Sequence, residues 1–111
     1  MGHISQSAFT EALEVAQKDF EIDICETTLM ALSDKDREFL SAMVSDAKES
    51  RVADIAERMN VTIDYLQKYR KRLIDSGVIE PAGRGYVRYA VPYIQEYLRK
   101  RLREQSEYQM L

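Results

Sequence analysis

Residues 50–77 read SRVADIAERMNVTIDYLQKYRKRLIDSG, and this stretch decides the fold. Its first part carries apolar residues at three- and four-residue steps, which predicts a short helix over 51–59. These apolar residues are Val52, Ile55, Ala56 and Met59. Ser50 is a favourable N-cap for this helix. Asn60 tolerates the left-handed backbone conformation that ends a helix, so we expect the helix to stop there.

A second helix is predicted over 63–76. Thr62 can cap its N-terminus, and Gly77 follows its last turn, where a C-terminal glycine is favoured. Two helices joined by a turn of about three residues are typical of a helix-turn-helix.

Two short strands are predicted after the second helix, over 78–80 and 86–91, with Gly83 and Gly85 in the turn between them. In the second strand, alternation divides the side chains into one set of Val87, Tyr89 and Val91 and another of Tyr86, Arg88 and Ala90. A β-hairpin that directly follows a helix-turn-helix is a wing.

Helical patterns flank this segment. A helix is predicted over 7–20 from the spacing of Phe9, Leu13, Ala16 and Phe20. Residues 21–31 have no clean period, and we expect a connector that packs on the domain.

Two further helices complete the chain. Ser33 is expected to cap a helix that buries Phe39, Leu40 and Met43. Pro92 suits the first turn of a final helix, which fades after Glu104. The apolar stripe of that helix is Ile94, Leu98 and Leu102.

The predicted fold is therefore mainly α with a small β-hairpin, a winged helix-turn-helix with an added helix at each end. Residues 1–31 form the N-terminal helix and the connector that packs on the domain. Residues 32–91 form the winged helix-turn-helix, and residues 92–111 the C-terminal helix.

Charge is distributed unevenly along the chain. The net charge is −3, but residues 1–50 hold 4 basic and 11 acidic side chains, whereas residues 62–103 hold 10 basic and 4 acidic ones. A basic segment in a mildly acidic protein fits a local face for a polyanion. Charges that neutralise one another around solvated helices would give the same counts, so both interpretations stay open.

The composition argues against an enzyme. The only histidine is His3, near the N-terminus, so a catalytic arrangement around an internal histidine is excluded. The four glycines cannot form a phosphate-binding loop. Cys25, the single cysteine, cannot form an internal disulfide, and we expect it to be a small core residue. We expect no catalytic residues, no cofactor and no bound metal.

We also expect no membrane partner and a cytoplasmic location. No stretch approaches the roughly 18 consecutive apolar residues of a membrane span. Residues 1–5 lack the basic start and apolar core of a signal peptide.

Four motifs carry a resemblance to a known family. They are LSDKDREFL (32–40), SRVADIAERM (50–59), YRKRLIDSGVI (69–79) and GRGYVRYAVPYIQEYL (83–98). The segment that contains them resembles the C-terminal winged-helix domain of bacterial AAA-type P-loop ATPases.

This resemblance implies an ATP-driven parent protein whose tail contacts DNA or regulates the motor, with the ATPase module as a partner. The chain has neither a Walker A nor a Walker B segment, so no nucleotide-binding residue can be carried over. Its start, MGHIS, favours an excised C-terminal domain over a stand-alone relative.

In helix-turn-helix proteins the second helix enters the major groove of DNA. In helix 63–76 we expect a buried side made of Ile63, Leu66, Leu73 and Ile74, with the stem of Arg70. The candidate DNA-binding residues on its other side are Tyr65, Gln67, Lys68, Lys71 and Arg72. Gln67 can read adenine, while the basic residues and Tyr65 can contact guanine or phosphates. The same residues also fit a solvated helix face, and Asp64 opposes nonspecific DNA binding.

The wing supplies the remaining candidates. Arg84 lies between two glycines and is expected to point outward, toward a minor groove or a phosphate. Tyr86 and Arg88 share an outward face. The alternative for this turn is that its glycines serve the backbone geometry alone.

The leading hypothesis is a DNA-binding winged-helix domain, the C-terminal part of a cytoplasmic AAA-type ATPase, that contacts duplex DNA through helix 63–76 and the wing at 80–88. The alternative is a module for protein–protein interaction, ATPase regulation or dimerisation that does not bind DNA. The acidic first half and the isoelectric point near 5.2 motivate this alternative. A homodimer paired through the terminal helices is among the partners considered.

Overall fold

The computed structural model describes the backbone of residues 6–109 and the side chains of residues 10–107. His3 and the side chain of Phe9 lie outside these described parts. The elements are α1 (Gln6–Met30), α2 (Asp34–Ala42), β1 (Ser50–Arg51), α3 (Val52–Met59), α4 (Ile63–Asp75), β2 (Ile79–Pro81), β3 (Tyr86–Tyr89) and α5 (Ile94–Gln109).

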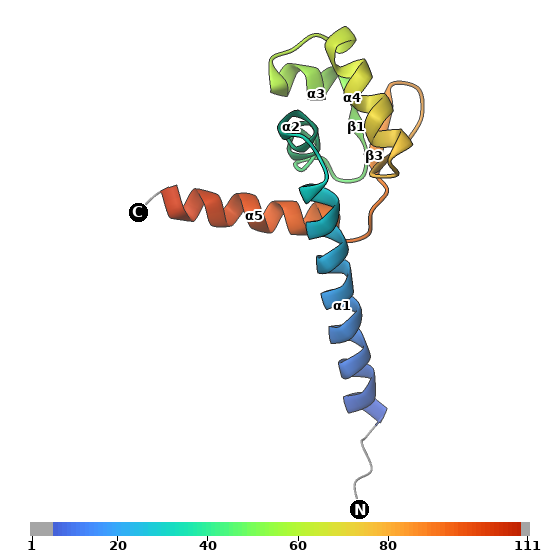
Figure 1. Cartoon of the computed structure of the whole chain (residues 1–111), viewed down its shortest axis with the longest axis vertical. Coiled ribbons are helices and arrows are strands. Elements are labelled where there is room, and N and C mark those ends of the chain that lie inside the picture. The colour runs from blue at the N-terminus through green and yellow to red at the C-terminus, as the bar shows by residue number, and fades with distance from the viewer. Residues whose placement is uncertain (1–5, 110–111) are drawn as a thin grey trace, which may run out of the picture.

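The predicted fold class is confirmed. Helices α3 and α4 form the helix-turn-helix, and β2 and β3 follow as the antiparallel wing (Figure 1). Helix α2 packs against both α3 and α4. Long helices lie at both ends of the chain, as predicted.

Local signals set the ends of the helices in the helix-turn-helix. Asn60 ends α3 in the left-handed conformation, with φ 57° and ψ 46°. The Thr62 hydroxyl caps α4 by accepting a hydrogen bond from the Tyr65 amide at 3.1 Å. Gly77, at φ 78°, turns the chain toward β2. These three predictions are confirmed.

A third strand joins the wing to the rest of the domain. Strand β1 pairs with β3, so the sheet order is β1-β3-β2. The prediction that Ser50 caps α3 is wrong, because its backbone belongs to this strand and its hydroxyl donates to the Asp46 carboxylate at 2.6 Å. Arg51 stands at the N-cap of α3 and makes no side-chain cap bond.

The core lies between the helix-turn-helix, α2 and the inner face of the wing. Its largest fully buried side chains include Phe39, Leu40, Met43, Ile55, Leu66, Leu73, Ile79 and Val87. The hydroxyl of Tyr89 donates to the Leu40 carbonyl at 2.6 Å and thereby joins the wing to α2. Burial raises the pKa of this hydroxyl, so it keeps its proton in alkaline solution as well as at neutral pH.

Helix α1 is longer than predicted, and the expected connector over 21–31 is mostly its second half. The stretch 6–30 contains no glycine or proline to break a helix. Ile22, Cys25 and Leu29 recur at helical spacing on the side that meets the body, and Cys25 and Leu29 are buried. The expectation that Cys25 is a core residue is confirmed.

The two end helices project from the body as arms. Figure 1 shows α1 and α5 meeting near the body and then diverging. The Cα radius of gyration is 17.2 Å, against about 13 Å for a compact chain of this length. The described part of the chain contains no helix that is both long enough and apolar enough to cross a membrane.

Helix α5 begins later than predicted and extends further. Tyr93 has φ 70°, a left-handed conformation that a helical first turn excludes, so the helix starts at Ile94 and Pro92 precedes it. Its end lies at Gln109 rather than near Glu104. Ile94 and Leu98 are buried against the body, while Leu102 is 37% exposed.

The burial of Cys25 yields a test of the contact between α1 and α5. Burial first, and then the carboxylates of Glu21, Glu96 and Glu26, raise the pKa of this thiol. Since only an exposed thiolate reacts, we expect the native thiol to react on the order of a thousandfold more slowly than the unfolded one. The measurement is the rate of reaction with a chromogenic disulfide at pH 8, with and without denaturant.

A control chain with Cys25→Ala and Ser45→Cys places the thiol at an exposed position of the α2–β1 loop. It should react rapidly without denaturant. A native Cys25 that reacts as fast as this control would contradict the buried junction.

Candidate nucleic-acid interface

A groove of about 530 Å³ lies between α4 and the wing. It is lined by Arg51, Val52, Ala53, Ile63, Gln67, Arg70, Arg84, Gly85 and Tyr86. Three arginines therefore surround one hollow, and they come from β1, α4 and the wing turn.

The short strand β1 brings these arginines together. In the sheet, Arg51 is paired with Tyr86, so it stands beside the base of the wing. The Val52 amide donates to the Gly85 carbonyl at 2.9 Å, which holds the start of α3 against the wing turn.

The wing turn depends on its two glycines. Gly83 has φ 108° and Gly85 has φ 81°. Residues other than glycine adopt these backbone conformations only at a cost in free energy. The Tyr86 amide closes the turn by donating to the Gly83 carbonyl at 3.1 Å. Arg84 is exposed between the two glycines, at the tip of the wing.

The groove has an excess of positive charge. Arg51 is paired with the carboxylate of Asp54 at 3.1 Å. Within the described side chains, neither Arg70 nor Arg84 has a carboxylate oxygen within 4.0 Å. Although the whole protein is acidic, two of the three groove arginines, Arg70 and Arg84, are therefore not paired with a carboxylate of the described side chains.

The structure brings together only three of the predicted site residues, namely Gln67, Arg84 and Tyr86, which line the groove. Lys71 lies about one helical turn beyond Gln67 and is exposed on the outer side of α4. Asp64 is exposed on the same outer side, seven residues before Lys71.

Tyr65 and Lys68 belong to a different surface of α4. The hydroxyls of Tyr65 and Tyr69 are 3.3 Å apart, and the Lys68 ammonium lies 5.1 and 5.0 Å from the centres of these two rings. Arg72 lies over the Tyr69 ring, at 5.3 Å. This tyrosine cluster holds Lys68 by cation–π contacts on the side of α4 next to α2.

Arg72 pairs with a buried carboxylate. Its guanidinium donates to Asp36 Oδ2 at 2.7 Å and to the Ser33 hydroxyl at 3.0 Å. Asp36 is only 2% exposed and completes a capping box with Ser33, the predicted cap of α2. Burial raises the pKa of Asp36, but the hydrogen bonds from Arg72 and Ser33 outweigh it and hold the pKa below its usual value. Arg72 therefore links α4 to α2.

Arg88 pairs with Glu80 across the two strands of the wing, on the exposed face that it shares with Tyr86. This pairing offsets its charge. Arg88 does not line the groove.

The sequence did not predict that three further residues, Arg51, Ile63 and Arg70, line the groove. Arg51 belongs to the two-residue strand β1, which is too short to show alternation, so nothing in the local pattern marked it. Ile63 was expected in the core, which is wrong, since it is 44% exposed at the groove edge. Arg70 was assigned to the buried side, and it is half-buried with its side chain in the groove wall.

The model of a domain of unknown function, DUF8462, matches residues 23–98. The chain belongs to this family. The DUF8462 match contains the whole groove and the contact between α1 and α5. Comparison with curated proteins gives no match.

Metal ligands do not cluster in the described structure. Among residues whose side chains are placed, no group of three or more His, Cys, Asp and Glu could hold a metal ion.

The pairing of Arg72 with Asp36 predicts a loss of stability in Arg72→Ala. The buried carboxylate would lose its cation, and we expect the free energy of unfolding at pH 7 to fall by about 1–3 kcal/mol. The pKa of Asp36 is lowered in the fold, so its contribution is present above the unfolded pKa of about 4 and is lost as the pH falls through the folded value. The stability difference should therefore shrink below about pH 4. Urea unfolding at pH 7 and at pH 3 measures both effects.

Lys71→Ala is the matched control, because it removes an exposed cation from the next position of α4. We expect its effect on stability to stay within about 0.5 kcal/mol. An equal loss in both variants, or a difference that is the same at both pH values, would contradict the structural role of Arg72.

Proposed function

We propose that this domain binds duplex DNA, with α4 in the major groove and the wing turn against the neighbouring phosphates. The observation that supports this most directly is the groove between α4 and the wing, with Arg51, Arg70 and Arg84 around it. A helix and a hairpin that border one basic groove suit a duplex, which presents a base edge and a phosphate backbone side by side.

Individual residues take separate roles in this proposal. Gln67 and Lys71 lie where α4 would meet base edges and phosphates. Arg84, at the wing tip, contacts a phosphate or enters the minor groove, and Tyr86 donates its hydroxyl to a phosphate. Arg72 serves the fold instead, and Arg88 is paired with Glu80, so neither belongs to the contact surface.

The contacts proposed here are mostly with phosphates. Binding should therefore depend little on DNA sequence and strongly on salt, because each phosphate contact releases counterions. The resemblance to the C-terminal domain of AAA-type ATPases supports a wider form of the proposal, in which this domain is the DNA-contacting tail of a cytoplasmic motor and carries no catalytic group of its own.

A module that binds only proteins is the second candidate. Asp64 and Asp75 are both exposed on α4 and would meet phosphates unfavourably, which favours this candidate. DNA binding of the unmodified chain separates the two functions, since the protein module would leave labelled duplex unbound even at low salt.

Removing the exposed cation of Lys71 on α4 together with that of Arg84 at the wing tip should weaken DNA binding. For the double variant Lys71→Ala and Arg84→Ala we expect the affinity for random duplex DNA at about 50 mM salt to fall at least about tenfold. The slope of log affinity against log salt should decrease in magnitude by about 2, because two phosphate contacts are lost. Fluorescence anisotropy of labelled DNA at about 50 to 200 mM salt measures both quantities.

The matched control is the double variant Lys18→Ala and Lys48→Ala. It removes the same charge from exposed positions of α1 and the α2–β1 loop. We expect it to keep the salt slope of the unmodified chain. Equal losses in the two double variants would show attraction by net charge alone and would overturn the proposed interface.

A further inference from the structure

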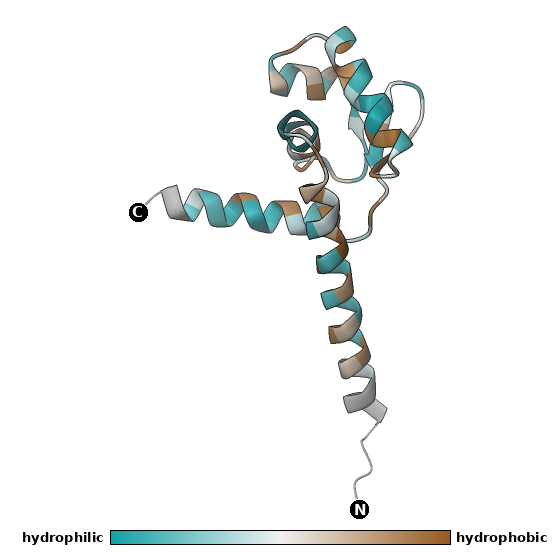
Figure 2. Ribbon diagram, in the orientation of Figure 1, coloured by the Kyte–Doolittle hydropathy of each residue, from teal (hydrophilic) through white to brown (hydrophobic). Residues whose placement is uncertain are grey.

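The projecting part of α1 carries an exposed apolar stripe. Every described side chain from 10 to 20 is exposed. Leu13 and Phe20 are 56% and 66% exposed, and Ile24 is 38% exposed. Figure 2 shows hydrophobic positions recurring along this arm. We call Leu13, Ala16, Phe20 and Ile24 the α1 stripe.

The rest of the described chain does not cover this stripe. At 100° per residue, the α1 stripe lies on the opposite side of the helix from Cys25 and Leu29, which pack on the body. A long helix that gains no tertiary contact along much of its length is only marginally stable in water. The arm therefore lacks the packing partner that its apolar stripe requires.

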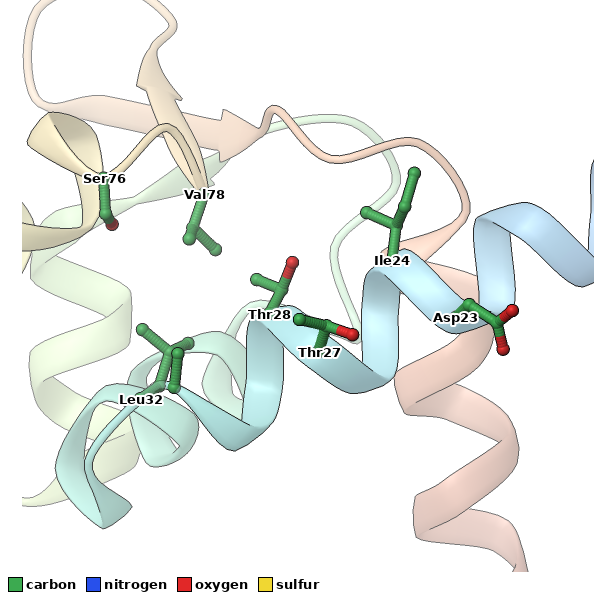
Figure 3. Close-up of a pocket in the computed structure, with 8 residues that line it drawn as sticks. Asp23, Ile24, Thr27, Thr28, Leu32, Ser76 and Val78 are labelled. Carbon is green, nitrogen blue, oxygen red and sulfur yellow. The ribbon is translucent and has the colours of Figure 1, made fainter.

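The stripe continues into an apolar hollow at the body. This hollow of about 410 Å³ is lined by Ile24, Thr28, Leu32 and Val78, among others (Figure 3). From Leu13 to Ala31, at the far end of the hollow, the surface is about 27 Å long. It can accept one helix of that length.

The charge of α1 indicates that a basic helix would cover the stripe. Along α1 there are six acidic residues and one basic residue, and Asp19 and Asp23 are exposed beside the stripe. Helix α5 carries four basic residues between 99 and 103 and measures about 24 Å. The second arm of the chain thus has the charge that the surface on α1 requires, and its projecting part, from Arg99 to Gln109, can cover about 16 Å of that surface.

Helix α5 cannot cover the α1 stripe of its own chain. The two helices touch at their bases, where the Tyr97 hydroxyl donates to Glu26 at 3.3 Å, and diverge beyond that point (Figure 1). We propose that a second copy of this chain covers the stripe, with α5 of each copy lying along α1 of the other. The contact is two-fold symmetric and self-complementary, and it does not depend on DNA binding.

A second hollow receives the partner in this arrangement. It measures about 210 Å³ beside α5 and is lined by Leu29, Leu98 and Leu102, with Arg37 and Arg101 among its polar residues. Phe20 is an exposed aromatic side chain with Asp19 and Asp23 beside it. Its ring suits the leucines of this hollow, and the two carboxylates suit the arginines beside them. Pairing of α1 with α1 would instead bring acidic flanks together.

Sedimentation equilibrium of the 111-residue chain tests the dimer. We expect a mass of twice 12.9 kDa that dissociates on dilution. Phe20→Asp should weaken dimerisation by at least about thirtyfold, the effect of losing an interface hot spot. Val15→Asp is the matched control, since Val15 is 61% exposed on α1 but lies away from the stripe, and it should leave the dimer intact.

A charge exchange tests which helices meet. Lys100→Glu with Arg103→Glu, which are exposed and three residues apart on one side of α5, should weaken the dimer, and adding Asp19→Lys with Asp23→Lys to the same chain should restore it. Circular dichroism verifies that each variant is helical. A chain that is monomeric at every concentration would overturn the proposal. So would an unchanged dimer after reversal of the α5 charges, or equal losses in Phe20→Asp and Val15→Asp.

Discussion

The buried carboxylate of Asp36 holds the helix-turn-helix to the rest of the domain. It accepts hydrogen bonds from the Ser33 amide and hydroxyl at the start of α2, and from Arg72 near the end of α4. One side chain therefore caps one helix and fixes the rotation of another. That rotation decides which side of α4 faces the wing. Because Arg72 is held in this way, a count of basic residues on α4 overstates the charge that the helix can offer to a ligand.

The groove is assembled from segments that are distant in sequence. Strand β1 contains only two residues, yet its pairing with β3 and the bond from Val52 to Gly85 bring the start of α3 to the wing turn. Arg51 and Arg84 reach the same hollow through these backbone contacts. The basic groove therefore forms only when β1 pairs with β3 in the folded domain.

Features that depend on neighbouring residues could be predicted from the sequence. The caps at Ser33 and Thr62, the left-handed Asn60 and the alternation of β3 each follow from local chemistry, and together they give the winged helix-turn-helix. The candidate site was harder to predict, because periodicity shows that Leu66 and Leu73 are buried but not what the other sides of α4 face. The same sequence pattern that marks Gln67 for the groove marks Lys68, which packs on tyrosines, and Arg72, which pairs with Asp36. Only the placement of α2 separates these roles.

The uneven charge along the sequence has a spatial meaning. Six of the 11 acidic side chains in residues 1–50 lie on α1, and four of the 10 basic side chains in residues 62–103 lie on α5. Within one chain these opposite charges are held apart, because the arms diverge from their shared base at Cys25. In the proposed dimer these charges come together, since α5 of one chain lies along α1 of the other. Exposed ion pairs stabilise an interface little, so most of the stability would come from burial of the apolar stripe on α1. A dimer of this form would place two copies of the groove in a fixed relation, so the spacing of two contacts along a duplex would follow from the packing of the arms.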